Sequence, residues 1–382
     1  METETNRSSP GRKLLLPVIP LLVLLLLELL VRVAVSFLGL TLDIVVIHPN
    51  LGQEELKKQI YINDRYLLWR MKPNLRGQFV SPAIVPEGRQ PPVFQVITNS
   101  AGFAGAEFSR EKRENALRIV CMGNSSTFGW GAHPDSCYPR LLEHSLSEKL
   151  GRDVEVINAG VPGYTSLQGL TLFKNEILKL SPDAITLAFG ANDCHRTSRS
   201  DSEIIREREG AVGAAQEMLS HIYLYKLLRY GIVSLKIKRE FKANTAPVSP
   251  RVSPREFRAA MKDVILRAKT SGADVFLVEI LPTHRQWDPY RKIHSQLSTE
   301  LEVPLLCVSK LFDEFLTDPM AHKGPVLSYI EAMREKYGED VIALHPDIYV
   351  RLDMVHPNSL GHLLIADALS LMIEASLAEG HY

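Results

Sequence analysis

From Leu117 onward, short apolar runs alternate with longer segments of helical periodicity, and this alternation constrains the fold more than any other feature of the chain. The runs predicted as strands are Leu117–Met122, Val154–Asn158, Ala184–Phe189, Asp274–Leu281 and Pro304–Val308. The segments predicted as helices are Cys137–Leu150, Ser166–Leu180, Pro254–Thr270, Tyr290–Glu300 and Gly361–Leu377. Parallel strands need a crossover connection, usually a helix, so we expect an α/β fold with a parallel sheet covered on both faces.

A long apolar run lies near the N-terminus. Leu14–Leu27 reads LLLPVIPLLVLLLL, and apolar residues resume after Glu28 and again after Arg32. About 20 apolar residues span a bilayer as a helix, whereas a cleaved signal peptide has a shorter run and a small-residue cleavage site. We therefore predict an uncleaved transmembrane anchor over residues 14–40 in preference to a cleaved signal. Glu28 and Arg32 lie four residues apart and can pair on one helix face, although the long Arg32 side chain can instead reach the interface.

Basic residues flank this span on one side. Arg7, Arg12 and Lys13 precede it, and residues 41–56 contain no Lys or Arg. Basic residues near a span tend to stay in the cytosol. The sequence therefore predicts a cytosolic tail over residues 1–13 and a single-pass topology with the remainder of the chain outside the cytoplasm.

Two regions fall outside the strand–helix alternation. Residues 41–115 hold several prolines and one run of β-formers, Val93–Thr98, and are predicted as a juxtamembrane segment with some β-structure. Residues 200–253 interrupt the alternation inside the expected domain of residues 116–382. Two interpretations remain open for this insertion, a lid over a site or extra helices packed on the sheet.

Charge and cysteine content argue against two classes of function. Lys and Arg together number 44, as do Asp and Glu, so the formal net charge is +0. A nucleic-acid partner would favour a basic excess, so none is expected. The cysteines contain no C-x-x-C pair, which argues against a zinc cluster, and we interpret them as small buried residues. They are Cys121, Cys137, Cys194 and Cys307.

Small and polar residues follow three of the predicted strands. Ligands of open parallel sheets bind beyond the carboxyl ends of the strands. The three strand ends are Gly123-Asn124-Ser125, Asn158-Ala159-Gly160-Val161-Pro162-Gly163 and Gly190-Ala191-Asn192-Asp193. The C-terminal part adds Asp353-Met354-Val355-His356.

Together these residue types are sufficient for acyl transfer through a serine. The Ser125 hydroxyl is a weak nucleophile and needs a base, for which His356 is the candidate. Asp353 lies three residues from His356 and can hold its other ring nitrogen. The oxyanion that forms on the ester needs donors already in place. The candidates are the Ser125 N–H, a backbone N–H at Gly163, which has no Cβ to obstruct approach, and the side-chain amide of Asn192.

These blocks resemble the SGNH or GDSL hydrolase family. The family's first block, Gly-Asp-Ser-x-Thr-x-Gly, is similar to the run from Gly123 to Gly129. Its glycine block is matched by Asn158–Gly163, and its Gly-x-Asn-Asp block by Gly190–Asp193. Its last block, Asp-x-x-His, is matched by Asp353 and His356.

The resemblance covers Leu117–Leu377 and implies a flavodoxin-like three-layer α/β/α sandwich of about five parallel strands. It implies a triad of Ser125, His356 and Asp353 that hydrolyses or transfers an acyl group, with no metal or organic cofactor. A membrane-anchored, extracytoplasmic site suggests an O-acyl ester of a glycan or lipid as the substrate. The nucleophile-elbow motif Gly-x-Ser-x-Gly is absent because Thr127 stands at its last position, which argues against the α/β-hydrolase fold.

One position departs from the family pattern. Asn124 stands where the family has Asp, and an amide keeps one acceptor oxygen but loses the charge. This departure keeps open an alternative function, that of a catalytically silent, membrane-anchored binding or assembly protein that retains the fold.

Overall fold

A five-stranded parallel sheet of order β11-β10-β7-β5-β6 forms the centre of the protein. The computed structural model describes residues 10–38, 60–83, 90, 92–242, 249–321 and 325–378. The strands of this sheet are β5 (Leu117–Gly123), β6 (Val154–Gly160), β7 (Ala184–Ala188), β10 (Asp274–Glu279) and β11 (Leu305–Cys307). Every residue of β5 and β7 is buried, including Arg118 and Thr186, as strands of a parallel sheet covered on both faces are.

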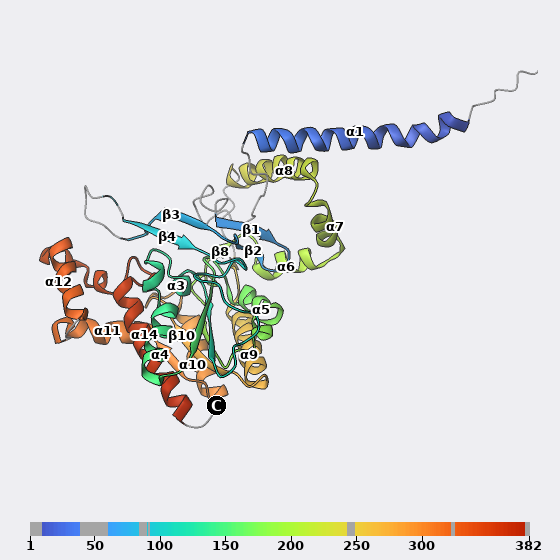
Figure 1. Cartoon of the computed structure of the whole chain (residues 1–382). Helices are drawn as coiled ribbons and strands as arrows, with labels where there is room; N and C mark the ends of the chain where they lie inside the picture. The colour runs from blue at the N-terminus through green and yellow to red at the C-terminus, as the bar shows by residue number, and fades with distance from the viewer. Residues whose placement is uncertain are drawn as a thin grey trace, which may run out of the picture.

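Helices cover both faces of the sheet and form two hydrophobic cores (Figure 1). One face packs against α4 (Tyr138–Leu150), α11 (Val308–Thr317) and α14 (Ser359–Ala378). The other packs against α5 (Ser166–Asn175), α9 (Pro254–Thr270) and α10 (Asp288–Leu301). The expected three-layer α/β/α sandwich with about five parallel strands is therefore confirmed.

Local sequence signals set the helix ends. Helix α9 has the predicted bounds because the N-cap residue Ser253 and Glu256 in the first turn form a capping box. Thr165 caps α5 as expected, but the predicted helix over Ser166–Leu180 is divided. Glu176 leaves the helical backbone at φ −130° and its carboxylate pairs with Arg70, so a 3₁₀ turn over Ile177–Leu180 completes the segment.

The helices between β11 and α14 were not predicted from the sequence. Helix α11 follows β11 without a loop, so Val308 begins a helix and does not end a strand. Two further helices, α12 (Pro325–Tyr337) and α13 (Glu339–Leu344), and a 3₁₀ turn over Pro346–Tyr349 lead toward α14. The loop after this turn carries Asp353 and His356.

Two antiparallel hairpins lie over the carboxyl ends of the sheet strands (Figure 1). They consist of β1 (Tyr61–Asp64), β2 (Leu68–Met71), β3 (Arg76–Val80) and β4 (Val93–Ile97). The predicted run of β-formers at Val93–Thr98 corresponds to β4. The first part of the predicted juxtamembrane segment, residues 41–59, lies outside the described residues.

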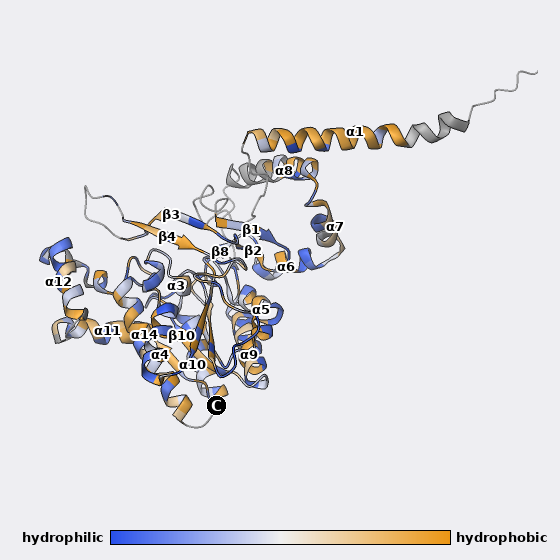
Figure 2. Ribbon diagram, in the orientation of Figure 1, coloured by the Kyte–Doolittle hydropathy of each residue, from blue (hydrophilic) through white to orange (hydrophobic). Residues whose placement is uncertain are grey.

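Helix α1 (Pro10–Phe37) extends away from the globular part of the protein (Figure 1). Its stretch Val18–Phe37 is long and apolar enough to cross a membrane and is not buried by the rest of the chain. Figure 2 shows this stretch as almost uniformly hydrophobic. Helix α14 meets the same criterion of length and composition, but its buried side chains pack on the sheet. The last two residues of the predicted span, 39 and 40, lie outside the described part.

The insertion forms helices α6 (Asp201–Glu209), α7 (Ala211–Leu219) and α8 (Tyr223–Lys242) and the short strand β9 (Ser249–Pro250). Helix α8 lies along α1 (Figure 1). The Glu28 carboxylate accepts hydrogen bonds of 2.9 and 2.8 Å from the backbone N–H groups of Tyr223 and Leu224. Arg32 pairs with Glu28 at 2.7 Å and donates to the His221 carbonyl. The two charges of the apolar stretch therefore pair, and they also bind the first turn of α8.

Candidate active site

Ser125 lies where β5 ends and a single helical turn, α3 (Ser125–Phe128), begins. The Asn124 side chain caps this turn by accepting a 2.9 Å hydrogen bond from the Ser126 N–H. Gly129 ends the turn at φ +87°, and a Cβ there would lie 2.6 Å from the Cys137 Cβ. Glycine is therefore required at this position, and the short turn presents Ser125 at the carboxyl edge of the sheet.

Three side chains from two distant segments, the turn at Ser125 and the loop of residues 353–356, form a continuous hydrogen-bonded line. The Nε2 atom of His356 lies 2.8 Å from the Ser125 Oγ, and its Nδ1 atom lies 2.7 Å from Asp353 Oδ2. The other carboxylate oxygen, Oδ1, accepts hydrogen bonds from the backbone N–H groups of Val355 and His356, at 2.7 and 2.8 Å. The structure thus brings together the serine, histidine and aspartate named from the sequence.

The carboxylate of Asp353 is held in its charged form. Burial alone would raise its pKa, but the hydrogen bonds and charge of His356 and the N–H of Val355 outweigh burial and lower the pKa below its usual value. A carboxylate with a lowered pKa is ionised throughout the neutral range. It can therefore accept a hydrogen bond from the Nδ1–H group of His356. The Nε2 atom is then unprotonated and can accept the proton of the serine hydroxyl.

The loop that carries His356 is fixed by contacts on both sides. The Leu352 N–H donates to the His356 carbonyl at 2.8 Å, and Arg351 donates to the Met354 carbonyl at 3.3 Å. Asn358 binds the Ile348 carbonyl through its side-chain N–H and accepts from the Gly361 N–H. These bonds tie the loop to the start of α14.

The turn Val161–Tyr164 follows β6 and carries the predicted oxyanion glycine. The Tyr164 N–H donates to the Val161 carbonyl at 3.1 Å, Pro162 stands at the second position, and Gly163 has φ +84° at the third. This combination defines a type II turn, which favours glycine at its third position. Among the described residues, the Gly163 N–H and the Ser125 N–H have no hydrogen-bond partner.

Asn192 and Asp193 follow β7 and take different positions. The Asn192 side-chain amide donates to the Tyr164 carbonyl at 3.0 Å, which leaves its second N–H unused and ties it to the same turn. Asp193 accepts from the Ser166 N–H and hydroxyl at 2.9 and 2.5 Å and from the Gly190 N–H at 3.0 Å. Burial raises the pKa of Asp193 to about 6. Asp193 therefore joins the end of β7 to α5 and lies away from the serine.

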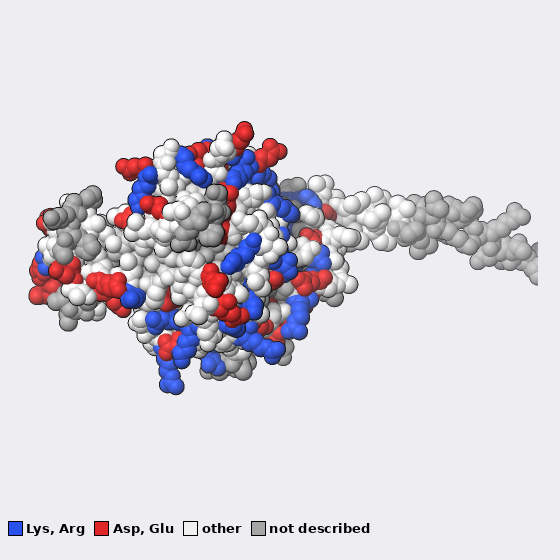
Figure 3. Space-filling view, turned by 90° about the horizontal axis from the view of Figure 1, so that it is seen from below, with Lys and Arg blue, Asp and Glu red and all other residues white. Residues whose placement is uncertain are grey.

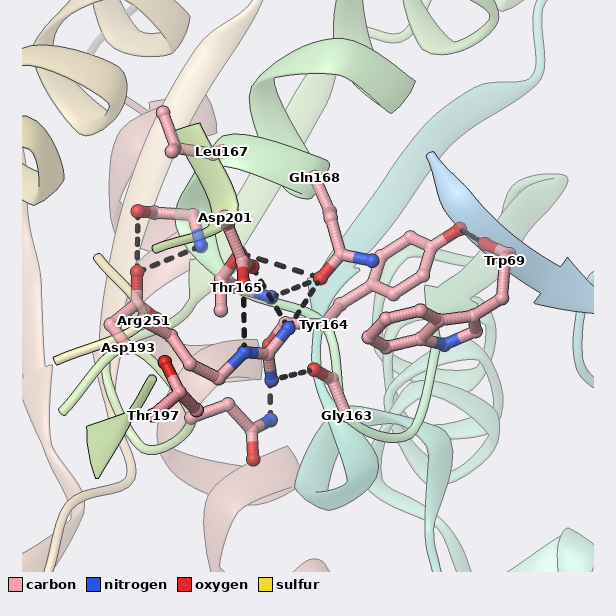
Figure 4. Close-up of polar contacts among 12 residues, drawn as sticks. Trp69, Gly163, Tyr164, Thr165, Leu167, Gln168, Asp193, Thr197, Asp201 and Arg251 are labelled. Atoms are coloured by element: carbon pink, nitrogen blue, oxygen red, sulfur yellow. Dashed lines mark hydrogen bonds and ion pairs between the residues drawn. The ribbon is translucent and has the colours of Figure 1, made fainter. Parts of the chain in front are cut away.

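Arg251, a buried residue of the insertion, contacts the glycine turn (Figure 4). It is not among the site residues that were predicted from the sequence. Arg251 donates to the Gly163 carbonyl at 2.7 Å and to the Gln168 side chain at 3.1 Å, and it pairs with Asp201 at 2.8 Å. Arg251 and Asp201 are both fully buried. They mark the two ends of the insertion, so these ends meet beneath the glycine turn. No local motif signals such a contact, because the partners lie far apart in the chain.

A cavity of about 400 Å³ lies beside the edge strand β6, away from the serine. Its walls include Phe128, Cys137, Glu143 and Asn158, and none of the three aligned side chains lines it. Within the described ranges, no group of three His, Cys, Asp or Glu side chains is arranged to hold a metal ion. Figure 3 shows Lys and Arg mixed with Asp and Glu over the face that it presents.

Several known proteins are similar to parts of this chain. An arylesterase from Vibrio mimicus is 32% identical over 76 residues, which is 20% of this chain and 38% of that relative, so the match spans well under half of the relative's length. The solved structure of LAE5, an alpha/beta hydrolase enzyme from the metagenome of Lake Arreo, is 17% identical with a TM-score of 0.40 over 66% of this chain and 93% of its own. A catalytic mutant of Axe2, an acetylxylan esterase from Geobacillus stearothermophilus, is 16% identical with a TM-score of 0.40 over 66% and 92%.

The family model matches most of the region that holds the sheet and the candidate site. Residues 121–364 match the GDSL-like lipase/acylhydrolase family, and this range is more than half of the chain. It includes all four sequence blocks from which the resemblance was drawn, from Gly123 to His356. The chain therefore belongs to the GDSL-like lipase/acylhydrolase family, a family of ester hydrolases.

Proposed function

We propose that this protein is a membrane-anchored serine ester hydrolase or acyltransferase that acts on an O-acyl ester of a glycan or lipid. The observation that carries the proposal is the unbroken line of hydrogen bonds from Asp353 through His356 to Ser125, at 2.7 and 2.8 Å. These distances lie within the reach that a nucleophile and its general base need.

The proposed reaction has two acyl-transfer steps. The Ser125 Oγ attacks the ester carbonyl carbon while its proton moves to His356 Nε2, and Asp353 stabilises the imidazolium. The oxyanion accepts hydrogen bonds from the N–H groups of Ser125 and Gly163 and from the Asn192 amide. His356 then gives the proton to the leaving alcohol oxygen, and an acyl-serine remains. Water, or a sugar hydroxyl in the acyltransferase case, attacks this ester with His356 again as the base, and serine is restored.

A glycan or lipid ester is proposed because helix α1 would hold the site near a membrane. Contacts of Glu28 and Arg32 with the insertion favour a retained anchor, since a cleaved signal would leave the protein and those contacts would be lost. The basic residues before the apolar stretch favour a cytosolic N-terminus. The catalytic domain of residues 116–382 would then lie outside the cytoplasm, with its insertion on the side of the anchor.

Protease protection in sealed vesicles tests this topology. We expect protease to digest the domain of residues 116–382 from the non-cytosolic side only, and the protein to keep its N-terminal residues when its mature mass is measured. Digestion of the domain from the cytosolic side would contradict the orientation. A mature chain that begins after residue 30 would contradict the anchor.

Labelling with a fluorophosphonate tests the activity. We expect stoichiometric labelling of the wild-type protein and none of Ser125→Ala. Ser126→Ala is the matched control, because Ser126 is the adjacent serine and its hydroxyl contacts the Val355 carbonyl and no base. The alternative, a silent binding protein, predicts that the folded wild-type protein is not labelled. The position of Asn124 favours activity. Its side chain caps the turn α3 and is not one of the three hydrogen-bonded side chains Ser125, His356 and Asp353, so this departure from the family pattern leaves the triad unchanged.

A further inference from the structure

The peptide bond between Pro162 and Gly163 determines where the Gly163 N–H points. The carbonyl of this same peptide, at Pro162, accepts a 2.9 Å hydrogen bond from the Tyr61 hydroxyl and a longer one, 3.4 Å, from the Trp69 indole N–H. Both donors belong to the β1–β2 hairpin. This hairpin lies outside residues 121–364, the range that matches the family.

Two conformations of such a turn differ in the direction of this peptide. Type I and type II turns differ by about 150° in ψ of the second residue and by about 170° in φ of the third, so the middle peptide is turned over. In the type I form the Gly163 N–H would point to the opposite side and would be lost to an oxyanion. A donor that holds the Pro162 carbonyl therefore also holds the N–H direction.

The hairpin residues are well placed to hold it. Tyr61 is 6% exposed and Trp69 only 1%. The indole packs on the turn so closely that a Cβ at Gly163 would lie 3.2 Å from it. Tyr164 returns a hydrogen bond of 2.7 Å to the Trp69 carbonyl. Burial raises the pKa of Tyr61, so its hydroxyl keeps its proton and remains a donor.

The backbone just before Trp69 is strained, which points to a position that the surroundings impose. Leu68 has φ +67°, a region that a leucine seldom adopts because its Cβ crowds the backbone there. Arg208 from the insertion donates to the Leu68 carbonyl at 3.0 Å and to the Asp64 carbonyl at 2.9 Å. The insertion thus holds the hairpin in the conformation that aims Trp69 at the turn.

We propose that Tyr61 and Trp69 are positioning residues for the oxyanion hole. Their hydrogen bonds to the Pro162 carbonyl hold the turn in its type II form and keep the Gly163 N–H directed at the reacting ester. The neighbouring carbonyl, at Gly163, is held by Arg251 (Figure 4), so both peptides of the donor turn are fixed by residues from outside the central sheet. This proposal rests on the proposed ester-hydrolase function, and it makes the segment between anchor and family domain a part of the active site.

The decisive variant is Tyr61→Phe, which removes one hydroxyl and keeps the ring. Loss of one net hydrogen bond predicts a fall in kcat of about 2- to 12-fold. We expect KM to stay within twofold, because the donor turn acts on the transition state. The double variant Tyr61→Phe/Trp69→Phe should lose about 10²- to 10³-fold, the scale for one lost oxyanion donor.

The control is Tyr66→Phe, which removes an exposed hydroxyl from the turn of the same hairpin. Kinetics are measured on a soluble chromogenic acetate ester, well below the melting temperature of each variant. The proposal is overturned if Tyr61→Phe and the double variant match the control in kcat, or if KM rises while kcat holds. If the Tyr61→Phe variant is destabilised, the Trp69→Phe variant, which lacks the second donor to the Pro162 carbonyl, serves for the same test. Failure of the proposed function looks different, because wild type would then neither turn over ester nor take the fluorophosphonate label.

Discussion

Replacing Asp353 by Asn isolates the role of the carboxylate without changing its size. In the native site Oδ2 faces the Nδ1 of His356 and Oδ1 faces two backbone N–H groups. The amide has one oxygen and one NH₂ group, so it cannot satisfy both sets. If its NH₂ faces His356, then Nδ1 must accept and Nε2 carries the proton, which removes the base from Ser125. If the NH₂ group instead takes the position of Oδ1, its N–H groups face the backbone N–H groups of Val355 and His356, and no hydrogen bond forms there.

The expected loss follows from the charge that forms during the reaction. An imidazolium at 2.7 Å from a carboxylate is stabilised by about 6 kcal/mol at an effective dielectric constant of about 20. The Asp353 side chain is 28% exposed, so screening by water reduces this to about 4–5 kcal/mol. One factor of ten in rate corresponds to about 1.36 kcal/mol, so we expect kcat to fall about 10³- to 10⁴-fold.

Steady-state hydrolysis of a soluble chromogenic ester measures the loss, with thermal unfolding as the test of integrity. Asp347→Asn is the matched control, because it removes one negative charge from the same stretch at an exposed side chain. We expect the control to retain wild-type kcat. A loss below tenfold in a folded Asp353→Asn protein would refute the reasoning, since His356 would then work without its partner.

The remaining predictions concern the base, the oxyanion hole and acid stability. Ser125→Ala and His356→Ala should each remove most of the rate, and their double variant should be little worse than either, because the two act as one unit; multiplied losses would contradict this. Asn192→Ala should lower kcat by about 10²- to 10³-fold with the fold intact, and an unchanged kcat would limit Asn192 to its contact with the turn. Burial lowers the pKa of His362 to about 3 and that of His294 to about 4. Below about pH 6.5 these histidines are therefore protonated in the unfolded chain but stay neutral in the folded protein. Stability is therefore lost as the pH falls, and denaturant titrations should find that His362→Gln loses about 2 kcal/mol less than wild type between pH 6.5 and 5; parallel curves would refute the assignment.

The sheet was predictable because its signal is local and dense. The apolar run Leu117–Met122 forms all of β5 except its last residue. An error in the assignment of one adjacent element does not change the prediction of this strand. The helices α11 to α13 were not predicted, since they begin directly at a strand end or lie in a stretch without strong capping signals. The break after α5 lies at Glu176, whose carboxylate pairs with Arg70, 106 residues away, and no window of sequence reveals this contact.

The candidate site shows the same division. Each sequence block is a few residues long, and the structure brings Ser125 and His356 together although 231 residues separate them. Their roles remain predictions that the experiments above test. Tyr61 and Arg251 could not be found in this way, because they contact the glycine turn across 101 and 88 residues and carry no motif of their own.

The contact of Glu28 with the first turn of α8 has a consequence for how the enzyme would meet its substrate. A domain joined to a membrane by chain alone samples a wide volume, and the effective concentration of its site at the surface falls with the reach of that chain. Glu28 lies near the middle of the apolar stretch Val18–Phe37, so with α1 in a bilayer this contact would carry the first turn of α8 into the membrane and would remove most of that freedom. The active site would then stand at one height and in one orientation over the membrane. Acyl groups at that height would be favoured over chemically identical groups elsewhere, so distance from the bilayer would act as a determinant of specificity alongside the shape of the site.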